Sequence, residues 1–303
     1  MTKTVRNTAT ALLQKDFPEG DFVLQGVIGE GLTLFGGKPK LGKSIFVLNV
    51  ALSVASGGYY LGRKVRKGVC AYLSLENKDK TTKRRLSEMI GRFDGTANTD
   101  DLLIENKWDS SNPLERLDNY LTDNPDVTFV VIDTLIKFFS RLGSSYNDTY
   151  SQIDALRELA ESQDVPILVI DHLIKSDSPH LIDMFSNSNG KTGAADNLMG
   201  LLHSKQYDAE LHVMGRDVDD LILPLEKQPE YKFWELKHKK SETKLQKDQL
   251  LETIKTMKGR QFSPQAISKT SGVDVGYCRK MLNSWASKSR YVASVAHGQY
   301  SAL

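Results

Sequence analysis

The sequence predicts an α/β protein with a mostly parallel central sheet and a small second domain at the C-terminal end. Apolar strand candidates alternate with helical segments through the first two thirds of the chain, a pattern typical of parallel sheets covered by helices. A loop rich in glycine and lysine joins the first strand candidate to a dense apolar helix. The last 60 residues are strongly basic and have a helical pattern of their own.

Each element of this fold follows from a local pattern. Short β-branched or apolar runs predict strands, and longer segments with helical spacing predict helices. The late strands are linked by short turns and are expected to be antiparallel. We expect strands near 32–36, 69–75, 102–105, 128–132 and 166–170, helices at 43–56, 79–93, 147–163 and 193–197, and further strands from 198 to 236.

Composition restricts the class of protein. The chain has 303 residues, 40% apolar and 26% charged, which is typical of a globular protein of two domains. Cys70 and Cys278 have no C-x-x-C partner, so a disulfide framework or a zinc site is not predicted. No apolar run approaches the roughly 20 residues that span a bilayer. We therefore expect a cytoplasmic protein with no membrane partner.

Charge is distributed unevenly along the chain. Residues 244–303 contain ten basic and three acidic residues, a net charge of +7, which leaves −5 for residues 1–243. A polar, highly charged stretch without apolar period, "ELKHKKSETKLQKDQ", separates the two parts and is typical of a linker. We predict an N-terminal arm at 1–20, a nucleotide-binding domain at 21–242 and a basic domain at 243–303.

Residues 37–44, "GKPKLGKS", match the phosphate-binding pattern G-x-x-x-x-G-K-[ST] between a strand and a helix. Glycine allows the backbone N–H groups to approach phosphate oxygens, and the helix N-terminus adds positive potential. Lys43 is expected to reach the β- and γ-phosphates of ATP, and the Ser44 hydroxyl to bind Mg²⁺. The alternative is a glycine-rich turn before a core helix. The predicted nucleotide contacts are Gly37, Lys38, Pro39, Lys40, Leu41, Gly42, Lys43, Ser44 and Ile45.

Polar residues end three later strand candidates. Asp133 follows "TFVVI" and is a candidate Mg²⁺ ligand, or else a helix cap. Glu76 ends "AYLSL" and is a candidate to orient and deprotonate water, although a single glutamate at a strand end is a weak signal. His172, in "VPILVIDHLIK", could contact the γ-phosphate or cap the following segment.

These four motifs in order resemble the RecA-like hexameric helicase group, nearest to plasmid RepA replicative helicases and more distantly the DnaB type. The resemblance covers about residues 20–240 and implies a RecA-like P-loop core. It implies that Glu76 is the catalytic glutamate, Asp133 the Walker B aspartate and His172 part of a γ-phosphate sensor. It also implies a homohexamer that acts on single-stranded DNA.

Two further positions carry roles implied by the resemblance. Arg216, in "LHVMGRDVDDLILPLE", is a candidate arginine finger for the neighbouring subunit, or simply an exposed turn arginine. The family's DNA-contacting loop falls at 176–193, where Lys191 is the only lysine beside two acids. That loop matches a strand-gripping surface poorly, although six copies of Lys191 would line one pore.

Residues 245–303 are predicted to form a winged helix. Two helices flank a short "TSGV" turn, and the final residues alternate around His297 and Gly298 as a small wing would. Arg279, Lys280, Lys288 and Arg290 are then candidate DNA phosphate contacts. A structural or subunit-contacting winged helix with solvated lysines is the alternative.

Three functions fit these patterns. The preferred one is an ATP- and Mg²⁺-dependent replicative helicase that couples hydrolysis to movement along single-stranded DNA. The second is an ATP-dependent DNA-binding regulatory or replication-initiation protein with slow hydrolysis and no unwinding, favoured by the poorly charged 176–193 loop. The third is a P-loop kinase that acts on a small molecule. The sequence shows no evident arginine-rich lid of the kind such a kinase needs, and the basic C-terminal domain would have no role in it.

Overall fold

The computed structural model divides the chain into two compact units, Met1–Lys237 and His238–Leu303. The predicted boundary near residue 242 falls just after this division. Of the predicted arm at 1–20, the structure describes residues 8–15, which include helix α1 (Ala9–Leu13). The residues described are 8–15, 22–93, 96–139, 142–143, 145–174, 178, 180–185, 188–216, 218–237, 242–273, 275–288, 290–296 and 298–303.

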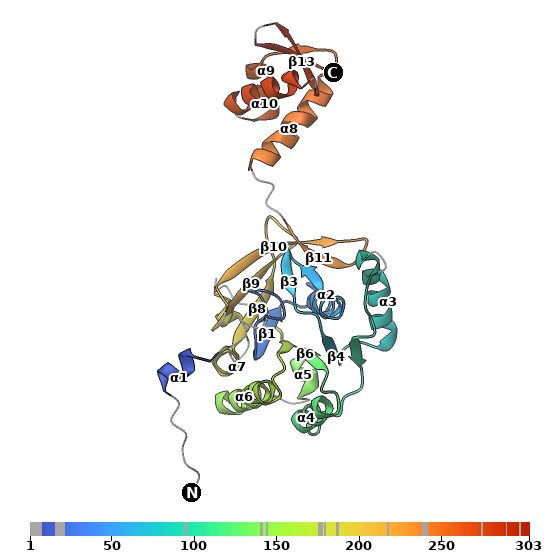
Figure 1. The fold of residues 1–303 in the computed structure, drawn as a ribbon, viewed down its shortest axis with the longest axis vertical. Helices are drawn as coiled ribbons and strands as arrows, with labels where there is room; N and C mark the ends of the chain where they lie inside the picture. Colours follow the sequence, from blue (N-terminus) through green and yellow to red (C-terminus); the bar gives the residue numbers. More distant parts are fainter. Residues whose placement is uncertain are drawn as a thin grey trace. The chain divides into compact units, whose positions relative to one another are not determined.

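The described part of the first unit contains one nine-stranded sheet in the order β11-β10-β9-β8-β1-β7-β6-β4-β5 (Figure 1). The strands from β5 to β8 in this order are parallel, and β9, β10 and β11 are antiparallel to their neighbours. This confirms the predicted α/β fold with a mostly parallel sheet. The strands are β1 (Leu32–Gly37), β4 (Val69–Ser74), β5 (Leu102–Glu105), β6 (Val127–Asp133), β7 (Ile167–Ile170), β8 (Asn197–Leu202), β9 (Ala209–Gly215), β10 (Leu221–Gln228) and β11 (Phe233–Leu236).

Helices cover both faces of this sheet, because alternate side chains of its buried strands point to opposite sides. Phe35 of β1 packs in an apolar cluster with helices α2 (Lys43–Ser56) and α3 (Asp79–Met89). Leu34, one residue earlier, packs in a second cluster with α4 (Pro113–Asp123) and α6 (Tyr146–Gln163). The two clusters therefore bury both faces of the parallel strands.

The helix predicted at 193–197 is wrong in its position, since α7 spans Ser188–Ala194. Gly190 lies so close to α6 that a Cβ would come within 2.9 Å of the Tyr146 carbonyl oxygen, and packing of this kind overrides the low helix propensity of glycine. After α7, Asp196 accepts a hydrogen bond from the Leu32 N–H at 2.9 Å. The chain therefore enters β8 beside β1.

Several short elements are absent from the sequence prediction. Helix α4 buries Leu117 and Leu121 among many polar residues. The hairpin of β2 (Gly58–Tyr60) and β3 (Arg63–Val65) has only three residues in each strand. The others are α5 (Leu135–Phe138) and the 3-10 turns Ile90–Phe93 and Leu181–Met184.

The second unit is a small domain with its own apolar core. It contains α8 (Glu242–Thr256), α9 (Pro264–Ser271) and α10 (Val275–Ser287), and its described strands β12 (Gln261–Phe262), β14 (Gln299–Ala302) and β13 (Val292–Ala296) form one antiparallel sheet. Leu250, Ile267 and Leu282, one from each helix, are completely buried. The strands β13 and β14 pair on either side of the predicted wing turn, of which His297 lies outside the described residues.

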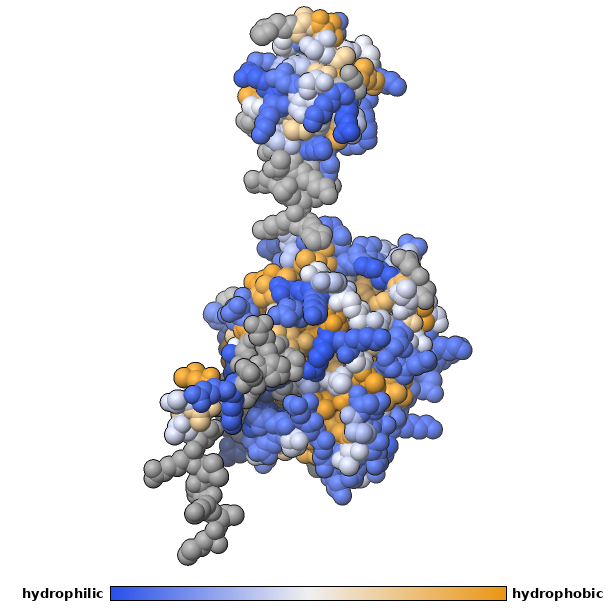
Figure 2. Space-filling view, viewed as in Figure 1, coloured by the Kyte–Doolittle hydropathy of each residue, from blue (hydrophilic) through white to orange (hydrophobic). Residues whose placement is uncertain are grey.

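The surface of both units is mostly hydrophilic on the face that Figure 2 shows, with scattered apolar patches. Within the described ranges, every helix is too short or too polar to cross a bilayer.

Candidate nucleotide-binding site

The loop between β1 and α2 has the backbone that its glycines allow. Gly42 adopts φ 109°, and Lys40 adopts φ 65°, angles that residues with a Cβ rarely adopt. At Gly37 a Cβ would lie 3.0 Å from the Leu201 carbonyl oxygen and 2.9 Å from the Lys43 side chain. The loop therefore turns tightly at the carboxyl end of β1, where it presents its backbone to the N-terminus of α2.

Lys43 is folded back over this loop. Its Nζ donates to the carbonyl oxygens of Gly37 at 2.5 Å and Lys38 at 3.2 Å, and the residue is 6% exposed. Burial lowers the pKa of Lys43, and the negative charges of Asp133 and Glu76 oppose that decrease. A desolvated ammonium held mainly by carbonyl oxygens is well suited to bind phosphate.

Asp133, at the end of β6, is completely buried beside α2. Its Oδ2 accepts from the Tyr72 hydroxyl at 2.8 Å, whereas Oδ1 has no hydrogen-bond partner in the described part of the chain. Burial raises the pKa of Asp133, and the nearby hydroxyls of Ser44 and Tyr72 limit that rise. An orphaned carboxylate oxygen near a hydroxyl fits Mg²⁺, which takes one or two protein ligands and completes its shell with water and phosphate.

Larger metal sites are not indicated. The described residues contain no group of three or more His, Cys, Asp or Glu side chains that could hold a metal ion. A magnesium ion at Ser44 and Asp133 would therefore depend on nucleotide phosphates for its remaining ligands.

Glu76 and His172 lie beside the lysine. The Thr134 hydroxyl donates to Glu76 Oε1 at 3.1 Å, and His172 Nε2 is 3.9 Å from the same oxygen. On its other side, His172 Nδ1 is 3.5 Å from Lys43 Nζ. The imidazole ring therefore lies between the lysine and the glutamate.

These side chains line one cavity of about 330 Å³. It brings together six of the nine predicted loop residues with Glu76, Asp133 and His172; Gly37 and Lys38 contribute through their bonds to Lys43, and Leu41 is not on its wall. Sequence analysis missed Asn77, Arg85, Thr134 and Lys227, which also line the cavity. Arg85 lies in a run of basic residues on α3, and Lys227 lies on β10 without any motif.

Lys191 has a setting different from the pore expected for it. It is buried on α7, and its Nζ lies 2.7 Å from Asp171 Oδ2, in a pair whose side chains are 5% and 7% exposed. Asp171 immediately precedes His172. Lys191 thus contacts the strand that carries the candidate sensor, and its proposed DNA contact remains a prediction.

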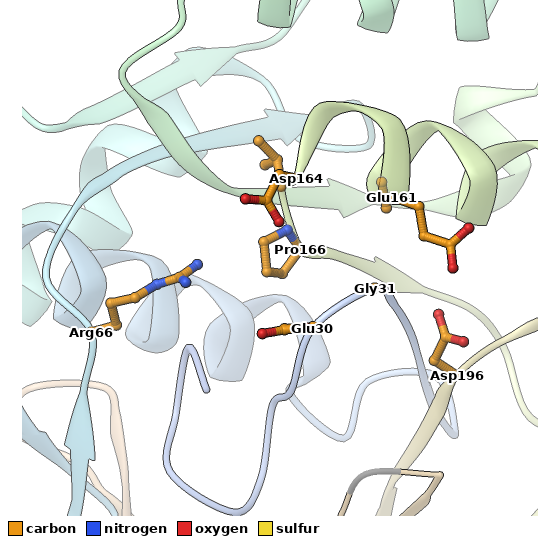
Figure 3. A pocket seen from close by; sticks show the side chains of 9 residues that line it. Glu30, Gly31, Arg66, Glu161, Asp164, Pro166 and Asp196 are labelled. Carbon is orange, nitrogen blue, oxygen red and sulfur yellow. The ribbon is translucent and has the colours of Figure 1, made fainter. Parts of the chain in front are cut away.

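Arg216 lies at the other end of the sheet, because β9 runs antiparallel to β8 and ends at Gly215. Its side chain is 62% exposed and its Nη1 is 3.3 Å from Asp196 Oδ1. Asp196 lines a second cavity, of about 220 Å³, whose wall is mainly acidic. In Figure 3 the Glu161 and Asp196 carboxylates lie on one side of it and Arg66 extends from the other. Arg216 therefore does not reach the nucleotide cavity of its own chain.

The candidate DNA contacts of the second unit are on its surface. Arg279 and Lys280 are exposed on α10, and Lys288 and Arg290 are exposed just after it. None of the four forms a salt bridge with a described residue.

Comparison with known proteins identifies the family of the first unit. A family model described as an AAA domain matches residues 3–178, more than half of the chain. The chain belongs to this AAA domain family. Membership confirms the coarser prediction of a P-loop ATPase.

The other comparisons add less. No curated protein matches the sequence. Among solved structures, a KaiC-like protein from the hyperthermophilic archaeon Pyrococcus horikoshii is similar, with a TM-score of 0.49 and 14% identity. That similarity covers 71% of this chain and 94% of the archaeal one, and it is too low to assign a function.

Proposed function

We propose that the protein is an ATP- and Mg²⁺-dependent ATPase that acts on DNA, of the RepA type, and couples hydrolysis to translocation along single-stranded DNA. The observation that carries the proposal is the meeting of Lys43, Glu76, Asp133 and His172 around one cavity. Each comes from the carboxyl end of a parallel strand or the adjoining loop, where α/β proteins bind their ligands.

The reaction assigned to this cavity is hydrolysis of the γ-phosphate. Water attacks phosphorus as the bond to the bridging oxygen of ADP breaks, and Glu76 accepts the proton of the water. Thr134 orients the Glu76 carboxylate through its 3.1 Å hydrogen bond. Ser44 and Asp133 would hold a Mg²⁺ ion, which would supply positive charge at the phosphates. Lys43, with Arg216 from a neighbouring subunit, offsets the charge that develops in the transition state.

Two parts of this proposal concern assembly and DNA. A hexameric ring is proposed because Arg216 is exposed and remote from its own cavity, as an arginine acting on a neighbour must be. The second unit is proposed to be a winged helix that binds DNA phosphates through Arg279, Lys280, Lys288 and Arg290. Its net charge and the exposure of these side chains support that role.

The burial of Lys191 favours a second candidate, an ATP-dependent DNA-binding regulatory or replication-initiation protein that does not unwind DNA. With Lys191 paired to Asp171, the 176–193 segment has little positive charge to hold a moving strand. ATP would then control the oligomeric state of the protein, and the second unit would bind the specific DNA site.

One experiment separates the two candidates. The rate of ATP hydrolysis is measured with and without single-stranded DNA at low salt, beside the size of the assembly with and without nucleotide. Strong stimulation in a ring-sized assembly is expected for the translocating ATPase. A hydrolysis rate that single-stranded DNA does not change, together with tight binding of duplex DNA, would support the regulatory function. The absence of any hydrolysis with the Mg²⁺ salt of ATP would overturn the first proposal.

A further inference from the structure

A lysine far from the phosphate-binding loop in the sequence faces the same cavity. Lys227 lies near the carboxyl end of β10 and lines the wall with Lys43 and Asp133. The register of β8, β9 and β10 makes β10 parallel to β1. The carboxyl ends of β10 and β1 therefore lie at the same edge of the sheet. Lys227 and the phosphate-binding loop, which line one cavity, belong to the same subunit.

Lys227 is held in place from two directions. Its backbone N–H donates to Asp208 Oδ2 at 2.9 Å. Its ammonium lies 5.9 Å from the centre of the Trp234 ring, which is its register partner on β11. This distance is within the range of a cation–π contact. The direction of the side chain is thus set by β11 rather than by a salt bridge.

The same tryptophan contacts the phosphate-binding loop. Trp234 Nε1 donates to the Gly42 carbonyl oxygen at 3.4 Å, and a Cβ on Gly42 would come within 3.3 Å of the indole ring. Trp234 itself is 2% exposed, and its backbone N–H donates to Asn49 of α2 at 2.9 Å. Lys227, Trp234 and the loop therefore form one packed unit.

Lys227 forms no salt bridge with a described carboxylate. No salt bridge to Lys227 is present within the described ranges, and Asp208 Oδ2 accepts a hydrogen bond from the backbone N–H of Lys227. Burial lowers the pKa of Lys227, the positive charges of Lys232 and Arg85 lower it further, and the negative charge of Asp208 opposes this decrease. A partly desolvated cation without a salt-bridge partner is costly, and a bound polyanion would reduce that cost.

We propose that Lys227 binds the phosphate chain of the nucleotide held by its own subunit, which makes β10 a second source of phosphate ligands beside the loop at 37–44. This inference rests on the proposed function, in which the cavity binds ATP. Binding would join the loop, Trp234 and the β10–β11 hairpin through one ligand.

The test compares two lysines of the same hairpin in the full-length protein. Lys227→Gln and the control Lys232→Gln each remove one positive charge, but Lys232 does not line the cavity. Affinity is measured with a fluorescent ATP analogue in the presence of Mg²⁺, and then by competition with inorganic tripolyphosphate. Melting temperatures of both variants verify that they fold, and Lys227→Arg retains the charge.

We expect Lys227→Gln to weaken both the ATP analogue and tripolyphosphate about tenfold, as the loss of a charged hydrogen bond would. Lys232→Gln should change either affinity less than about twofold, and Lys227→Arg should retain most of the binding. Equal effects of the two Gln variants would overturn the inference. So would a loss of ATP affinity without a loss of tripolyphosphate affinity, because the contact would then be to the base or ribose.

The two proposals fail in different ways. If the wild-type protein does not bind the ATP analogue, the proposed function itself is wrong. If the wild-type protein binds and Lys227→Gln binds equally well, only the role of Lys227 is wrong.

Discussion

The two ends of the central sheet carry opposite kinds of charge. At the carboxyl end, Lys43, Arg85 and Lys227 share a cavity with two carboxylates. At the amino end, Glu30, Glu161, Asp164 and Asp196 share a cavity with a single arginine, Arg66. One strand, β1, connects the two, since Gly31 lines the acidic cavity and Gly37 begins the phosphate-binding loop.

The difference between the two ends lies in how their charges are satisfied. Lys43 and Asp133 are buried, with the pKa of each shifted toward its neutral form by desolvation. At the amino end Arg216 is mostly exposed and pairs with Asp196. Substitutions at the carboxyl end should therefore change the chemistry and stability of a single chain, whereas Arg216 should matter only when chains assemble.

The largest effect is expected at Lys43. Lys43→Ala removes the ammonium that faces the phosphates and should reduce ATP hydrolysis by at least about 100-fold. The fold should remain, because Lys43 makes its hydrogen bonds to loop carbonyl oxygens and, at 3.5 Å, to the His172 ring, and to no group of the apolar core. Steady-state hydrolysis and circular dichroism measure the two outcomes. Full turnover in the variant would show that this cavity is not the site of ATP hydrolysis.

A substitution of Arg216 tests whether the amino end of the sheet acts on a neighbouring subunit. Arg216→Ala should abolish most hydrolysis in the assembly but change the free energy of unfolding by less than about 0.5 kcal/mol, as expected for an exposed pair. Mixing Arg216→Ala with Lys43→Ala subunits should restore part of the activity, since some interfaces then contain both residues. No rescue at any mixing ratio would show that Arg216 does not act on a neighbour.

The buried pair of Asp171 and Lys191 should dominate stability near the site. Lys191→Met leaves a buried carboxylate without its cation, which typically costs about 3–5 kcal/mol. The double variant Asp171→Asn with Lys191→Met removes both charges and should recover much of that loss. Urea unfolding of the three proteins measures this coupling, and a loss below about 1 kcal/mol for the single variant would mean that the pair is more solvated than its geometry indicates.

Substitution of Asp133 should have a smaller effect on stability than substitution of Lys191, and of opposite sign. Asp133→Asn should abolish hydrolysis but raise the melting temperature at pH 7 by about 2–4 °C without nucleotide, the shift that about 1 kcal/mol produces in a domain of this size. An amide retains an acceptor for the Tyr72 hydroxyl and removes the desolvated charge. Thermal melts of both proteins measure the shift.

The pH dependence of that difference provides the control. The pKa of Asp133 is raised in the folded protein, so the folded state favours the protonated acid, and stability from this group is lost as pH rises through the folded pKa. Below the unfolded value near 3.9 the acid is neutral in both states. The advantage of Asp133→Asn should therefore shrink as pH falls from 7 toward 4, and a constant difference would assign it to another cause.

The carboxyl end was largely predictable from sequence, and the reason is topological. Asp133, Glu76 and His172 each follow an apolar strand, and parallel strands bring their carboxyl ends to one edge. The loop at 37–44 marks that edge. What could not be predicted depends on partners distant in the chain. Lys227 reaches the cavity through two antiparallel pairings, β8 with β9 and β9 with β10, and Lys191 is withdrawn from the surface by its pairing with Asp171.

Trp234 gives the protein an intrinsic optical reporter. Its indole N–H donates to the Gly42 carbonyl oxygen, so the emission of this side chain depends on the conformation of the loop. The other two tryptophans lie elsewhere: Trp108 stacks on Phe138, and Trp285 belongs to the core of the second unit. Occupancy of the cavity can thus be followed in the unlabelled protein, in real time and without a chemical probe.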